Sequence, residues 1–239
     1  MAEDAIPRRG FLKGAGAAGA AAATVLGARP EPAQAQTAVA EAATETAASE
    51  AYLTLTAIEA AFFSAAYDTF VPADKLSPAG TNCGLVTFMD RQLAGAWGGG
   101  ARLYRAGPFL QGKPEHGYQL PLTPREYFAA GIKAANAWTR KTYGKDFDRL
   151  SEQDREAALK AMEEGKAPFP GFSSRMFFDA LLQITMEGFF ADPIYGGNRD
   201  MAGWKMVGYP GLPATYREEI TKYFGKKYDK PPRSIADFS

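Results

Sequence analysis

Apolar residues recur at helical spacing in several separate stretches of the chain, and capping signals delimit most of these stretches. Thr56, with Glu59 three residues later, forms a capping box that predicts the start of a first helix, which Pro72 ends. Its expected apolar face consists of Ile58, Phe62, Ala65, Ala66 and Phe70. A second helix is predicted from Gly84 to Trp97, ahead of three consecutive glycines.

Three further helices follow an irregular stretch at 101–122 that is rich in Gly, Pro and aromatic residues. Thr123, Pro124 and Glu126 predict a helix start, and the apolar spacing continues to about Tyr143. A short helix capped by Ser151 extends through Met162. Ser173 is the predicted cap of the most apolar helix, 176–190, which is apolar over most of its circumference. Such a helix is central in its domain or covered by another chain.

These patterns predict a mostly α fold: a single helical domain with long irregular Gly/Pro/aromatic loops. Strand patterns are weak throughout and no internal repeat is evident. Residues 36–51 contain mainly Ala, Thr and Glu, which cannot bury a core, so they are expected to form a flexible tether. The helical domain is assigned to residues 52–224, with a C-terminal tail at 225–239.

The first 35 residues have the features of a twin-arginine signal peptide. Arg8 and Arg9 are followed by Phe11 and Leu12, which together resemble the address read by the twin-arginine translocase. The stretch from Gly14 to Leu26 is mostly Ala and Gly and is therefore only weakly hydrophobic. Ala33 and Ala35 fit a small-x-small cleavage site with a mature start at Gln36. The alternative is an Ala-rich tail that contains two arginines by chance.

Composition excludes several function classes. The chain has 27 basic and 27 acidic residues. The predicted signal contains four of the basic residues and three of the acidic ones. The mature chain, with 23 against 24, is therefore nearly neutral and unsuited to nucleic-acid binding. No apolar stretch after the signal is long enough to span a bilayer. One Cys and one His cannot form a haem-attachment motif, a zinc site or an iron–sulfur cluster without a partner, so no cofactor is expected in this chain.

A few polar residues have more than one interpretation. Cys83, the lone thiol of an exported protein, is a candidate for an intersubunit disulfide, but it could equally be a small buried hydrophobe. His116 lies in a polar loop and is expected to be exposed. Asp179, Gln183 and Glu187 share one stripe of the apolar helix. They could serve acid–base chemistry, although a satisfied polar seam is the simpler interpretation.

The segment after the most apolar helix carries a distinctive series of residues. It contains Glu-Gly-Phe-Phe-Ala-Asp-Pro-Ile-Tyr-Gly-Gly-Asn at 187–198, then Gly-Trp at 203–204 and Gly-Tyr-Pro-Gly at 208–211. This series resembles the gluconate 2-dehydrogenase subunit 3 family, the small subunits of membrane-associated flavin dehydrogenases. The resemblance covers about residues 52–224, and the signal peptide and chain length are similar to those of the family.

The resemblance implies a role and a set of partners. The partners are a large FAD-containing subunit of the glucose–methanol–choline oxidoreductase type, a multihaem cytochrome c subunit and the twin-arginine translocase. FAD and haem c would lie in those partners, and the substrate would be a sugar, polyol or sugar acid. The small subunit would supply the export signal and stabilise the flavoprotein in the periplasm, associated with the cytoplasmic membrane through the complex.

The residues of this segment favour binding over catalysis. The predicted partner interface consists of Phe189, Asp192, Tyr195, Gly196, Gly197, Asn198, Trp204 and Tyr209. Aromatic side chains of this kind dominate protein interfaces, and no nucleotide-binding glycine pattern is present. The alternative for the segment is a surface loop that packs on its own domain. For the whole chain, the rival interpretations are an independent periplasmic enzyme or sugar-binding protein, and a scaffold for other envelope proteins.

Overall fold

The computed structural model describes residues 51–110, 112–113, 116–212 and 215–238. The predicted signal residues Arg8, Arg9, Phe11, Leu12, Ala33 and Ala35, and all but the last residue of the predicted tether, lie outside this range. Across the described part, the chain forms seven α-helices and no strand, which confirms the mostly α fold. The helices are α3 (Ala57–Phe70), α4 (Leu85–Ala94), α5 (Pro124–Tyr143), α6 (Glu152–Glu163), α7 (Ser174–Phe190), α8 (Ala202–Val207) and α9 (Arg217–Lys222). Short 3₁₀ turns are η2 (Phe147–Arg149), η3 (Pro193–Tyr195), η4 (Arg199–Met201) and η5 (Ile235–Phe238).

The capping signals locate most helix starts correctly. Thr56 and Thr123 both form complete capping boxes with the Glu three residues later. In each box, the Thr hydroxyl accepts from the backbone N–H of the Glu, and the Glu carboxylate accepts from the backbone N–H of the Thr. Ser151 caps α6 by accepting from the N–H of Asp154. Ser173 precedes α7 as predicted, but its side chain makes no capping hydrogen bond.

An aromatic core joins the helices of the body. Phe62 on α3 lies against Phe147 of η2 at 4.7 Å between ring centroids, and against Phe177 of α7 at 6.1 Å. Phe128 of α5 completes the cluster at 6.1 Å from Phe177. All four rings are buried, and Asn136 fixes η2 to α5 because its side-chain oxygen accepts from the N–H of Phe147. The body therefore depends on aromatic burial between distant segments.

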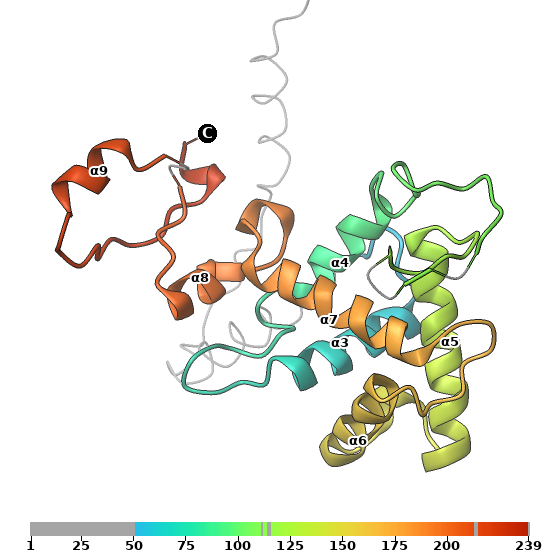
Figure 1. The fold of residues 1–239 in the computed structure, drawn as a ribbon. Coiled ribbons are helices and arrows are strands. Elements are labelled where there is room, and N and C mark those ends of the chain that lie inside the picture. The colour runs from blue at the N-terminus through green and yellow to red at the C-terminus, as the bar shows by residue number, and fades with distance from the viewer. Residues whose placement is uncertain (1–50, 111, 114–115, 213–214, 239) are drawn as a thin grey trace, which may run out of the picture. The chain divides into compact units, whose positions relative to one another are not determined.

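Helix α7 occupies the centre of this arrangement. It contacts α3, α4, α5, α6 and α8, and Figure 1 shows it (orange) running past α3 and α4. Its buried side chains include Phe177, Leu181 and Ile184, whereas Leu182 and Met186 are 37% and 46% exposed. The helix is therefore central, as expected, but one side of it faces solvent.

Two details of the predicted helices are wrong. Ile58, expected on the apolar face of the first helix, is 66% exposed, because Phe62, Phe63 and Ala66 define the face that meets the core. The second helix ends at Ala94 rather than Trp97, because the N–H of Gly95 bonds back to the carbonyls of Arg91 and Gln92 and the chain then turns.

A buried carboxylate secures the start of the folded domain. Asp90 on α4 is 4% exposed and accepts hydrogen bonds from three consecutive backbone N–H groups, at 2.6 Å from Leu53, 2.9 Å from Thr54 and 3.0 Å from Leu55. Charge-assisted hydrogen bonds of this kind are stronger than neutral ones. Asp90 thus binds the chain that enters α3 to the face of α4.

Candidate functional site

The residues of the distinctive segment form a compact junction after α7. A Cβ atom at Gly197 would lie 2.3 Å from the carbonyl oxygen of Gly188, and one at Gly203 would lie 2.2 Å from that of Phe189. Neither distance is sterically allowed, so both positions require glycine. Gly196 ends η3 in a left-handed conformation. The glycines therefore let the loop return directly onto the end of α7.

Asn198 and Trp204 hold this junction from inside. Asn198 is fully buried in a left-handed conformation; its side chain donates to the carbonyl of Ala191 and accepts from the N–H of Gly203, both at 2.8 Å. The Trp204 indole is 6% exposed and donates to the carbonyl of Phe190 at 2.8 Å. Buried backbone groups need such partners, which explains why an amide and an indole occupy these positions.

Asp192 connects the junction to the C-terminal tail. One of its carboxylate oxygens accepts from the N–H of Ile194 at 3.0 Å, and the other from the N–H of Ile235 at 2.9 Å. The tail also pairs with residues 210–212, since Leu212 donates to the carbonyl of Arg233 and Arg233 donates to that of Pro210. The tail is therefore bonded to the distinctive segment.

The predicted interface residues divide into a buried and an exposed group, with Asp192 and Gly196 half-buried between them. Phe189, Gly197, Asn198 and Trp204 are buried within their own domain, where they shape the junction and offer no surface to a partner. Tyr195 and Tyr209 are 51% and 43% exposed, and Ile194, Met206 and Val207 beside them in the sequence are exposed as well. Part of the segment thus packs on its own domain, and its exposed aromatic residues stay the predicted partner contacts.

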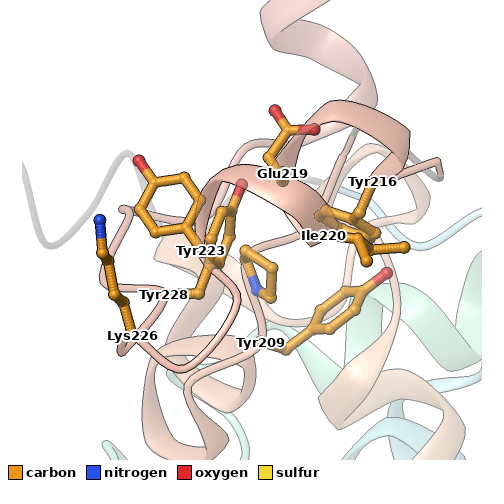
Figure 2. A pocket seen from close by; sticks show the side chains of 8 residues that line it. Tyr209, Tyr216, Glu219, Ile220, Tyr223, Lys226 and Tyr228 are labelled. Carbon is orange, nitrogen blue, oxygen red and sulfur yellow. The ribbon is translucent and has the colours of Figure 1, made fainter.

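A tyrosine groove lies next to this junction and was not predicted from the sequence. It has a volume of about 470 Å³ and is broadly open to solvent. Its lining residues are Tyr209, Pro210, Tyr216, Glu219, Ile220, Tyr223, Lys226 and Tyr228 (Figure 2). Tyr209, Tyr216 and Tyr223 recur every seven residues, and Tyr228 follows five residues later, in the tail that was placed outside the domain. The abundance of tyrosine over residues 209–228 is the feature of the sequence that could have indicated this groove.

The other singled-out residues carry no reactive arrangement. Cys83 is 1% exposed, and burial raises the pKa of its thiol, which makes it a poor nucleophile. This burial agrees with the interpretation of Cys83 as a small hydrophobe and leaves the sulfur inaccessible to a disulfide partner. His116 is exposed, as predicted. Asp179, Gln183 and Glu187 are exposed, and the side chain of Gln183 donates to that of Glu187 at 2.8 Å. This arrangement agrees with a stripe of polar residues that bond to one another.

Two stacked tyrosines are the most unusual polar groups in the body. The rings of Tyr118 and Tyr127 are parallel, with centroids 4.1 Å apart, and neither buried hydroxyl has a hydrogen-bond partner in the described part of the chain. Burial raises the pKa of Tyr118 to about 12 and that of Tyr127 further. Both phenols therefore stay protonated at neutral pH and cannot act as bases there.

Neither metal-ligating clusters nor membrane-spanning helices occur in the part of the chain that the structure describes. Nowhere among residues 51–110, 112–113, 116–212 and 215–238 do three His, Cys, Asp or Glu side chains gather to hold a metal ion. Within the same ranges, no helix has both the length and the apolar character needed to cross a membrane. What the described surface offers is aromatic contact area.

These features define a helical domain with exposed aromatic residues next to a compact junction, and comparison with known families shows which family the chain belongs to. The family model described as gluconate 2-dehydrogenase subunit 3 matches residues 57–211, and the twin-arginine translocation signal model matches residues 5–25. The chain therefore belongs to the gluconate 2-dehydrogenase subunit 3 family. Its signal sequence indicates export across the cytoplasmic membrane. No curated protein and no solved structure matches it.

Proposed function

We propose that this chain is the non-catalytic small subunit of a periplasmic FAD-dependent dehydrogenase complex. It escorts the folded flavoprotein through the twin-arginine pathway and stabilises it afterwards. The observation that carries this proposal is the presence, on one chain, of a twin-arginine signal at 5–25 and a dehydrogenase-subunit domain at 57–211. A route that carries folded proteins allows one signal to export two polypeptides that are already bound to each other.

The distribution of exposed residues supports a binding role. Tyr195 and Tyr209 project from a junction that Asn198, Trp204 and Asp192 hold with side-chain hydrogen bonds. Rigid aromatic side chains lose little conformational entropy on binding, which makes them effective anchors. In this proposal FAD belongs to the large subunit, of the glucose–methanol–choline oxidoreductase type, and haem c to a cytochrome subunit. The substrate is a sugar, polyol or sugar acid, and the complex is associated with the cytoplasmic membrane.

The test is to replace Arg8 and Arg9 together with lysine in cells that express the whole complex. The large subunit is then expected to accumulate in the cytoplasm, and dye-linked dehydrogenase activity in the periplasm is expected to fall to background. The control is Arg29→Lys, the same chemical change outside the paired arginines, which is expected to leave export intact. Continued arrival of the large subunit in the periplasm would contradict the escort role.

A further inference from the structure

We infer that the tyrosine groove binds an extended, acidic, proline-containing segment of the flavoprotein subunit. The identity of that partner rests on the proposed function, whereas the chemistry of the segment rests on the groove itself. The groove extends the binding surface beyond the family-matched region, since six of its eight lining residues follow residue 211.

The aromatic lining of the groove suits a proline-containing chain. Tyr228 lies between Tyr223 and Tyr216, with ring centroids 4.8 Å and 5.9 Å away and near-perpendicular planes. Figure 2 shows Tyr223 and Tyr228 to the left of the groove and Tyr209, Tyr216 and Ile220 to the right, and the contact between Tyr216 and Tyr228 joins the two sides at one end. Grooves walled by aromatic rings accept proline-rich segments, whose polyproline II conformation exists before binding and loses little entropy.

The groove is already formed in the isolated chain. The Tyr216 hydroxyl donates to the carbonyl of Gly211, and the parallel bridge between Gly211 and Arg233 closes the chain excursion that contains the groove. In contrast, none of the hydrogen bonds among the described residues uses the hydroxyl of Tyr223 or Tyr228. These two donors are available to the carbonyl groups of an extended chain, which has no internal hydrogen bonds of its own.

The lining of the groove contains one acidic and one basic residue, Glu219 and Lys226, and the surrounding segment adds a net positive charge that favours an acidic partner. Residues 217–233 contain six Lys or Arg and three Asp or Glu. Lys230 lies 5.5 Å from the ring centroids of both Tyr223 and Tyr228, and Lys222 lies 5.7 Å from that of Tyr223. Asp229 is paired with Lys227, so it does not neutralise Lys230 directly. Carboxylates that flank a proline would meet these ammonium groups at the edge of the groove.

Site-specific photocrosslinking in the intact complex tests this inference. A photoreactive phenylalanine analogue is placed at Ile220, which lines the groove and is 68% exposed, and the crosslinked peptide is identified by mass spectrometry. The expected product joins Ile220 to an acidic, proline-containing segment of the large subunit. The same analogue at Leu76, which is 69% exposed on the loop after α3, is the matched control and is not expected to capture that segment.

Two outcomes would overturn the inference. One is a crosslink from Ile220 only to phospholipid or to another region of the partner, and the other is no crosslink, in each case while the large subunit still co-purifies. If no large subunit co-purifies with the unmodified chain, the proposed function itself fails, so the two failures are distinguishable.

A charge-reversal variant provides a second test that leaves the tyrosine rings in place. Lys230→Glu combined with Lys226→Glu is expected to weaken binding of the large subunit about tenfold or more at low salt, with a smaller difference at high salt. The control, Lys133→Glu with Lys141→Glu on α5, makes the same change in net charge far from the groove in sequence. Equal weakening by both pairs would contradict a specific role for the groove.

Discussion

The helical body and the C-terminal region of this protein differ mainly in how far they bury their aromatic side chains. In the body, residues 57–190, buried rings such as Phe62, Phe128 and Phe177 join the helices across long sequence separations. In the C-terminal region, residues 191–238, single polar side chains such as Asp192 and Asn198 bond to backbone groups, while aromatic rings such as Tyr195 remain exposed. The body therefore buries its rings in a core, whereas the C-terminal region keeps several rings at the surface, where the proposed function places the partner contacts.

The largest expected effect comes from removing a ring at the centre of the body. Phe62→Ala deletes a side chain with no solvent exposure that contacts Phe63, Phe147 and Phe177. The free energy of unfolding of the mature chain is expected to fall by about 3–5 kcal/mol, measured by urea denaturation. The exposed Phe224→Ala, at 86% exposure, is the control and is expected to change stability little.

A smaller effect is expected at the point where the chain enters the body. Asp90→Ala removes the acceptor of three backbone N–H groups, which is expected to cost about 2–3 kcal/mol in the free energy of unfolding. Hydrogen exchange should show faster exchange at Leu53, Thr54 and Leu55. Asp179→Ala, which removes a carboxylate whose side chain is 60% exposed, serves as the control. Unchanged protection of the three amides would contradict the assignment of Asp90 as their acceptor.

A local effect is expected where the distinctive segment meets α7. Gly203→Ala places a methyl group against the carbonyl of Phe189, which is expected to destabilise the junction by about 1–3 kcal/mol. The matched control is Gly208→Ala, because a Cβ there meets no neighbouring atom, although its positive φ carries a cost of its own. Faster hydrogen exchange confined to residues 191–238 would show that the two regions unfold separately. Equal loss of protection in the body would contradict that separation.

The smallest expected effect is a pH dependence at the start of α5. Hydrogen bonds from the backbone and side chain of Thr123 lower the pKa of the Glu126 carboxyl in the folded protein. A lowered folded pKa means that this contribution to stability is present above the unfolded pKa, about 4.3, and is lost as pH falls through the lower folded value. Glu126→Gln should therefore reduce the loss of thermal stability on acidification below that pH. If acidification lowers the melting temperature of Glu126→Gln and of the unaltered protein equally, Glu126 does not contribute to the pH dependence of stability.

The sequence predicted the body better than the C-terminal region, for physical reasons. Capping boxes and helical periodicity are local signals, so the start of α5 at Pro124 and its end at Tyr143 follow directly from residues near them. The role of Asp90 depends on a segment 35 to 37 residues away, which no local pattern encodes. The tyrosine groove likewise depends on the return of the tail to Asp192 and Gly211. The residue series at 187–211 indicates the family, but it does not indicate that the side chains of Asn198 and Trp204 face inward.

The central claim is that this chain binds and exports a redox enzyme without being one. The most direct measurement separates the subunits of the complex purified from the periplasm, then records the flavin absorbance and dye-linked sugar oxidation of each fraction. The account predicts that flavin and turnover stay entirely with the large subunit, and that adding this chain back increases its thermal stability. Flavin absorbance and turnover in the fraction that contains this chain alone would contradict the account.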